Sequence, residues 1–387
     1  MALIKCKECG EEISSTAKSC PHCGYKNDVN VCPECGKRVK DSDEICSHCG
    51  FPLVKKKANN VITENLDKLT GAKSTNYVTF KDLFKNTFKK HTDEELDEVF
   101  VCGSKTTTPD VKSIDPKSAS AWVYFKILVF FVIAYVPTYI GYVYYQNSNF
   151  LPAMVILAAF AVPVAVLIFF FEINLFRNIS FYKTLKYFVI GGAASLLTAI
   201  LYFSLPFFAE KTAVLNVEGA FFVGLIEEVA KTIIVAFFLF KNKKCNYILN
   251  GLLVGAAVGA GFGAFETAGY ILRFYLNNGL EAMITVMKLR AFLAPGMHVA
   301  WAAIEGAALM YVKGFEKLDK KHLNDKRFLL LCCIPIVLHW LWDCPINSPL
   351  YIFHIGLTVV AWIVIVYFIN LGLKQIDDAK MRKKDSE

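Results

Sequence analysis

The chain has 387 residues, of which 55% are hydrophobic, with a formal net charge of +8 and a mean hydropathy of +0.40. Soluble globular proteins rarely have this composition, whereas a multi-span membrane protein with a soluble extension does. The basic residues cluster in short segments beside apolar runs, which favours a role in membrane orientation, so no nucleic-acid partner is expected.

Residues 6–49 contain two cysteine tetrads that repeat after 26 residues, each built from two C-x-x-C pairs separated by ten residues. Four thiolates at this spacing predict one closed tetrahedral zinc site per tetrad, and metal binding supplies the folding energy of units with so little core. We expect zinc ribbons at residues 1–27 and 28–53, with two structural zinc ions and a structural or partner-recruiting role in the cytoplasm. The expected ligands are Cys6, Cys9, Cys20, Cys23, Cys32, Cys35, Cys46 and Cys49.

Residues 54–120 are expected to form a soluble connector. Within it, the stretch from Phe80 to Phe88 has apolar residues at helical spacing and lysines on the opposite side. This pattern fits a helix that packs on the protein or a helix that lies on an anionic membrane surface, and both interpretations stay open.

From Ala121 onward the sequence predicts about eight apolar spans. The expected fold is therefore an all-α polytopic membrane protein preceded by two small zinc ribbons, with a membrane domain at residues 121–373 and a tail at 374–387. The expected spans are residues 121–145, 151–171, 187–208, 213–240, 248–274, 291–312, 328–343 and 350–373.

Basic residues set the expected orientation of these spans. They follow the second, fourth, sixth and eighth spans, whereas the loop after the fifth span is an exception with Lys288 and Arg290. By the positive-inside rule we expect a multi-pass protein of the plasma membrane with both termini in the cytoplasm. The ribbon thiolates then lie on the reducing side, which agrees with a metal-binding role.

The fourth span contains Glu227, Glu228 and Lys231 in an otherwise apolar run. Each ionisable group at membrane depth costs about 2.5–3.5 kcal/mol on insertion scales, so such groups mark function by default. Lys231 is four residues after Glu227 and three after Glu228, so an ion pair within the helix is possible. A structural salt bridge is the plainer alternative to a catalytic carboxylate pair.

Three further spans carry ionisable residues. Four glycines at a spacing of four residues, from Gly251 to Gly263, predict close helix packing and lead to Glu266. The sixth span carries His298 with Glu305 on the same face, and the seventh carries the pair His339-x-x-x-Asp343, one helical turn apart. We expect these side chains to line one water-filled cavity that opens toward the outer face.

Taken in order, these motifs resemble those of the PrsW-type intramembrane proteases. That family belongs to a wider group with the CAAX prenyl endopeptidases and the bacterial Abi/CPBP proteins. The wider group often has histidine where this chain has Glu266, so the glutamate is more typical of PrsW. The resemblance implies hydrolysis of a peptide bond near the outer face of the membrane. The implied substrate is a membrane-anchored protein similar to an anti-sigma factor. The catalytic residues it implies are Glu227, Glu228, Lys231, Glu266, His298, His339 and Asp343.

Two mechanisms fit these residues. In one, a catalytic zinc is held by His298, His339 and a glutamate such as Glu228, with another glutamate as general base. In the other, no metal binds, Glu227 and a histidine activate water, and the second histidine with Asp343 stabilises the oxyanion. A CAAX-type prenyl-protein endopeptidase, a transporter or sensor with a polar path, and a membrane scaffold for the ribbons are the alternative functions.

Overall fold

A computed structural model of the chain describes residues 3–6, 9–14, 20–23, 46, 48, 61–72, 77–346 and 349–385. The chain divides into two units, residues 1–61 and residues 62–387, which are treated separately below.

The N-terminal unit contains a short antiparallel pair of strands, β1 (Leu3–Lys5) and β2 (Glu12–Ser14). β1 leads into the first C-x-x-C pair and β2 follows it, and the four thiols of Cys6, Cys9, Cys20 and Cys23 lie within 4.8 Å of one another. This arrangement is the first expected ribbon. Of the second tetrad, Cys46 is buried, while Cys32, Cys35 and Cys49 lie outside the described residues.

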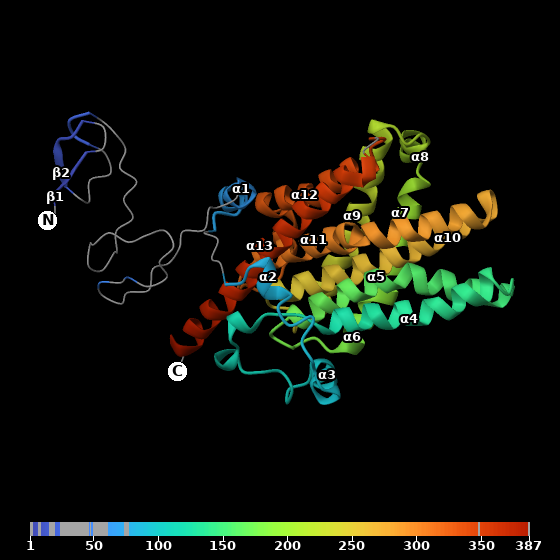
Figure 1. Cartoon of the computed structure of the whole chain (residues 1–387), viewed down its shortest axis with the longest axis horizontal. Helices are drawn as coiled ribbons and strands as arrows, with labels where there is room; N and C mark the ends of the chain where they lie inside the picture. Colours follow the sequence, from blue (N-terminus) through green and yellow to red (C-terminus); the bar gives the residue numbers. More distant parts are fainter. Residues whose placement is uncertain are drawn as a thin grey trace. The chain divides into compact units, whose positions relative to one another are not determined.

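The second unit is built from helices, as the sequence predicts (Figure 1). Its α-helices are α1 (Val61–Thr70), α2 (Phe80–Leu83), α3 (Asp93–Phe100), α4 (Val123–Val143), α5 (Leu151–Ile173), α6 (Phe181–Lys186), α7 (Gly192–Phe203), α8 (Pro206–Thr212), α9 (Val217–Lys241), α10 (Ile248–Leu293), α11 (His298–Lys313), α12 (Lys326–Asp343) and α13 (Ile352–Asp385). Short 3₁₀ turns are η1 (Val111–Ser113), η2 (Pro116–Ser118), η3 (Ser148–Phe150), η5 (Ala294–Gly296), η6 (Lys320–Asn324) and η7 (Pro349–Tyr351), and η4 (Tyr187–Gly191) is a π-helical turn.

Five helical stretches of the described residues are long and apolar enough to cross a membrane, so the expected count of about eight spans is not confirmed. These stretches are Pro116–Val143, Ser148–Ile173, Phe181–Phe203, Ile248–Lys313 and Ile352–Lys384. The fourth stretch joins two expected spans because α10 and α11 follow each other almost without a break. α9 and α12 match expected spans in position, but each carries several charged residues. These include Glu227, Glu228 and Lys231 in the middle of α9, and Lys326, Arg327 and Asp343 at the two ends of α12.

Helix α10 is a hairpin rather than one straight rod. Glu266 and Arg290 are 24 residues apart, which corresponds to about 36 Å on a straight helix, yet their side chains form an ion pair. The chain reverses at Gly279, whose φ of 79° favours glycine. Residues 280–293, here called the second limb, therefore fold back along residues 248–278, the first limb. The sequence reading placed a loop at residues 275–290, where the structure has helix.

The expected glycine stripe lies against α11. A Cβ at Gly251, Gly255 or Gly259 would come within about 2.0–2.2 Å of a backbone carbonyl oxygen of α11, so only glycine allows this approach. Figure 1 shows the two helices side by side near the centre of the helical unit. The stripe is thus a packing surface, and it contacts α11 from the first residue of that helix, His298.

We expect Gly255→Ala to destabilise the helical unit strongly. The new methyl group would meet the carbonyl oxygen of Ala302 at 2.0 Å, and backbone atoms cannot move aside as a flexible side chain does. The free energy of unfolding should fall by more than the roughly 1–3 kcal/mol typical of overpacked cores. The matched control is Gly269→Ala on the same helix, where a Cβ meets nothing within 4 Å. Thermal unfolding in detergent compares them, and equal midpoints would contradict the packing role.

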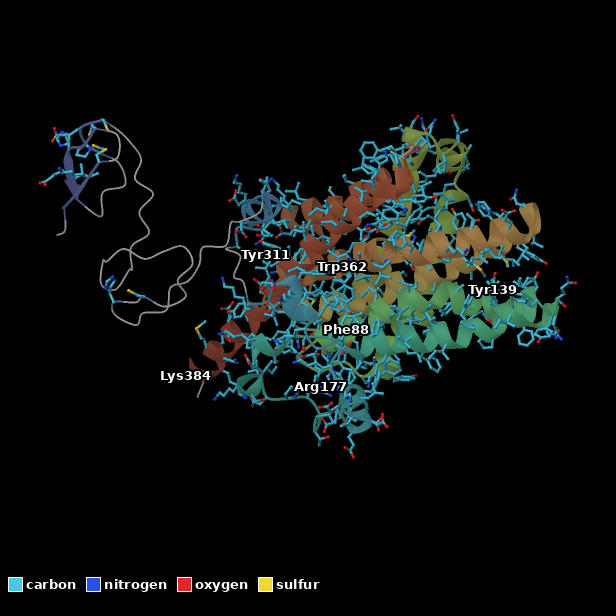
Figure 2. All side chains as sticks on the ribbon, in the orientation of Figure 1. Phe88, Tyr139, Arg177, Tyr311, Trp362 and Lys384 are labelled. Atoms are coloured by element: carbon cyan, nitrogen blue, oxygen red, sulfur yellow. The ribbon has the colours of Figure 1, made fainter. Side chains whose placement is uncertain are left out.

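The connector packs on the helical unit through apolar side chains. Leu83 is fully buried, and the ring of Phe84 stacks on Phe169 of α5 with centroids 5.2 Å apart. Trp362 of α13, labelled in Figure 2, packs against the same Phe84 ring. In α1, the backbone carbonyl of Thr70 accepts a hydrogen bond from a tyrosine of α11. Of the two open interpretations, the structure therefore supports a packing helix.

Candidate active site

The seven catalytic residues that the resemblance implies gather between α9, α10, α11 and α12. Two close approaches of backbone bring these helices together. Gly224 of α9 leaves room for the backbone of α12 beside His339, and Gly263 of α10 faces the ring of His298 at the start of α11. Both histidines are 3% exposed, so the site lies inside the helix bundle.

Lys231 sits at the centre of the cluster and has no exposed surface. Its Nζ donates a hydrogen bond of 2.5 Å to Glu228 Oε1 and lies 2.9 Å from His298 Nδ1. The rings of Phe262 and Trp301 flank the ammonium at 4.8 and 5.4 Å. Lys231 thus balances the charge of Glu228 in a site where an unpaired charge is costly.

His339 is held from two sides. Its Nδ1 donates a hydrogen bond of 2.5 Å to Glu228 Oε1, and its ring stacks on Trp301 with centroids 4.4 Å apart. Its Nε2 faces two other carboxylates, at 3.3 Å from Asp343 Oδ2 and 3.8 Å from Glu227 Oε2. A carboxylate on one ring nitrogen fixes the tautomer and leaves the other nitrogen directed at the centre of the site.

His298 makes the matching contact on the opposite side. Its Nε2 donates a hydrogen bond of 2.9 Å to Glu266 Oε2, which also accepts from Arg290 Nη2. The sequence reading did not include Arg290 among the site residues. The available signal was that Arg290 departs from the expected orientation pattern. The structure accounts for Arg290, which is paired with Glu266 inside the protein, whereas Lys288 is exposed.

The residues present fit a metal ion. Glu227, His298 and His339 each offer one ligand atom, and the three atoms lie within 4.8 Å of one another. Oε2 of Glu227 is buried and has no hydrogen-bond partner among the described residues, and the same holds for Oε2 of Glu228 and both carboxylate oxygens of Glu305. Of these three glutamates, only Glu227 belongs to the metal-sized group. Glu228, the glutamate named as a ligand from the sequence, instead holds Lys231 and His339 through its Oε1. The structure thus brings Glu227, rather than Glu228, into the metal-sized group.

The cysteine cluster of the N-terminal unit fits a second kind of metal site. The four thiols of the first tetrad lie within 4.8 Å of one another, with Sγ–Sγ distances of 3.6 Å for Cys6–Cys23 and Cys9–Cys20. Four sulfur ligands at this separation match tetrahedral zinc, whose Zn–S bonds are about 2.3 Å long.

Comparison with known families finds two matches along the chain. Residues 180–370 match the model of a family described as PrsW family intramembrane metalloprotease. Residues 6–50 match the model of the double zinc ribbon. The first match spans α9 to α12 and therefore every residue of the buried cluster.

Curated relatives agree with the first match. The chain is 29% identical over 187 residues to Protease PrsW of Halalkalibacterium halodurans, covering 48% of this chain and 80% of that protein. It is 28% identical over 217 residues to Protease PrsW of Shouchella clausii, covering 55% and 94%. For Protease PrsW of Clostridioides difficile the values are 27% over 189 residues, 48% and 76%. No solved structure matches the chain significantly.

Proposed function

Because the chain belongs, through residues 180–370, to the PrsW family of intramembrane metalloproteases, we propose that its buried cluster cuts a membrane-anchored protein. The observation that carries the proposal is the meeting of Glu227, His298 and His339 from three helices within 4.8 Å. Peptide hydrolysis needs an activated water, stabilisation of the tetrahedral intermediate and a proton for the leaving amine. The cluster has a group for each task.

Glu227, His298 and His339 are the residues that would hold a catalytic zinc, and His298 would exchange one of its two contacts, with Lys231 or with Glu266, for the metal. Bound there, zinc supplies Lewis acidity for the peptide carbonyl and for the attacking water. Glu228 orients His339 through Nδ1, and Lys231 offsets the negative charge of Glu228. Loss of a residue that hydrogen-bonds a metal-ligating histidine typically lowers metal affinity by about 10–100-fold.

We assign the role of general base to Glu266. It lies beside His298, and its side chain is 16% exposed, so an entering water can reach it. Glu266 takes a proton from the water as the water oxygen attacks the carbonyl carbon. The same proton then passes to the amine nitrogen when the C–N bond breaks. In the version without metal, Glu227 takes the proton, and His339 with Asp343 donates to the oxyanion.

The proposed setting is the plasma membrane, with both termini in the cytoplasm and the site nearer the outer face. Basic residues after α9 and α11 and in the last turn of α13 support this orientation by the positive-inside rule. The substrate we propose is a membrane-anchored regulator of the anti-sigma-factor type, which gives the reaction a role in signalling. The double zinc ribbon, with two structural zinc ions, then recruits a cytoplasmic protein partner.

The test identifies new protein N-termini, which mark cleavage sites, in membranes that contain the wild-type chain, a His339→Ala chain or a His354→Ala chain. His354 lies on α13 and serves as a matched histidine outside the cluster. We expect at least one membrane-anchored protein to be cut in the wild type and in His354→Ala, but not in His339→Ala. Reconstitution of that protein with purified enzyme in vesicles should reproduce the cut. Cleavage that persists in His339→Ala would contradict the proposal.

A further inference from the structure

The second limb of α10 brings a cation to the proposed general base. Arg290 Nη2 donates to Glu266 Oε2, and Arg290 Nε donates to Thr267 Oγ1 at 2.8 Å. The guanidinium also lies over the ring of Tyr270, with Cζ 4.4 Å from the ring centroid. Three contacts of different kinds thus define the position of one side chain, which is only 15% exposed.

The limb that carries Arg290 is itself firmly packed. Met283 and Met287 are almost fully buried and contact Met154 of α5 and Ile271 of the first limb. The hydroxyl of Tyr135 on α4 points at the sulfur of Met287 at 3.8 Å. Because the limb is anchored in this way, the guanidinium is a fixed part of the site rather than a long surface side chain that samples many positions.

Oε2 of Glu266 accepts from both Arg290 and His298. Two donors on one oxygen restrict rotation of the Glu266 carboxylate, and this restriction also fixes the direction of its other oxygen, Oε1. A narrow pocket lined in part by Thr267, Arg290 and His298 opens beside this arrangement. Since a displacement of about 1 Å at a reacting group costs on the order of 100-fold in rate, the orientation of Glu266 matters to the reaction.

We propose that Arg290 is a positioning residue for the hydrolysis: the second limb of α10 folds back so that its guanidinium holds Glu266 in line with His298. This inference rests on the proposed function of the cluster. Arg290 touches neither substrate nor metal and acts through the carboxylate it holds. Arginine suits the task because its planar fork bonds a carboxylate and a hydroxyl at once, whereas lysine offers a single point charge.

The experiment measures kcat and KM for cleavage of the identified substrate by the full chain in vesicles. We expect Arg290→Gln to lower kcat at least tenfold while KM changes less than threefold. Arg290→Lys keeps a cation near Glu266 and should recover part of the loss. The matched control is Arg273→Gln, because the exposed Arg273 stacks on the same Tyr270 ring, with Cζ 4.6 Å from its centroid. This variant should keep the wild-type kcat.

Wild-type kcat in Arg290→Gln, or a loss in Arg273→Gln as large as in Arg290→Gln, would overturn the inference. So would an Arg290→Lys variant no better than Arg290→Gln. If Arg290→Gln does not accumulate as folded protein, Arg290→Lys decides alone: a several-fold lower kcat at unchanged KM supports the inference, and an unchanged kcat overturns it. An inactive wild-type chain would instead refute the proposed function, so the two failures are distinguishable.

Discussion

Glu227→Gln is expected to lower the cleavage rate by about 10²–10⁴-fold, the range typical for loss of a group that handles water or protons. The exchange keeps the shape of the side chain but removes its negative charge. In the wild type, Oε2 of Glu227 is buried without a hydrogen-bond partner among the described residues. In zinc-free protein, removal of this buried negative charge should leave thermal stability unchanged or raise it. Loss of activity together with undiminished stability is the signature we expect of a functional carboxylate.

The control for this prediction is Glu218→Gln in the first turn of the same helix. Glu218 is exposed and accepts from Lys211 Nζ at 2.7 Å, and a solvent-screened ion pair of this kind contributes little to stability. Activity and stability should both stay close to the wild type. Cleavage rates and unfolding midpoints of the two variants are measured side by side in vesicles. Glu227→Gln with full activity would remove Glu227 from the catalytic residues.

Short-range pairs in the site were predictable from the sequence because helix geometry alone sets them. The spacing between Glu228 and Lys231 allows an ion pair, and the structure contains it. The spacing of His339 and Asp343 places both on one helix face, and their side chains lie 3.3 Å apart. The glycine stripe similarly predicts a close neighbour for α10. In each case residues three or four apart on one helix carry the information.

Contacts that depend on chain reversal were not predictable in the same way. Glu227 and Glu228 are adjacent, so which of them joins the histidines depends on the rotation of α9 against α11 and α12. Arg290 reaches Glu266 only because the helix reverses at Gly279. The Asn-Asn-Gly sequence that ends at Gly279 predicts the end of a helix, but it does not predict the direction in which the next helical segment runs. The expected count of about eight membrane spans is not confirmed, because a helical hairpin and spans that carry charged residues cannot be counted from apolar length alone.

Removal of the zinc ribbons is expected to leave one zinc ion per chain. The full chain should bind three, two in the ribbons and one between Glu227, His298 and His339. A chain lacking residues 1–60 retains nearly all of the helical unit, which comprises residues 62–387. In that shortened chain His298→Ala should abolish zinc binding, because a three-ligand site that loses one ligand no longer competes with water. His354→Ala, the same change outside the cluster, should leave the zinc in place. Zinc is measured by elemental analysis of purified protein.

Glu228→Gln in the shortened chain gives a graded version of the same test. The amide retains the shape of the side chain but no longer offers a charged acceptor to His339 Nδ1. Zinc affinity should therefore fall by about 10–100-fold rather than vanish. Cleavage should be lost in chelator and return when zinc is added back. A shortened chain that contains no zinc yet cleaves its substrate in chelator would favour the mechanism in which Glu227 and the histidines act without metal. Such a result would leave Glu227→Gln inactive, so the identity of the catalytic residues and the presence of the metal are decided by separate measurements.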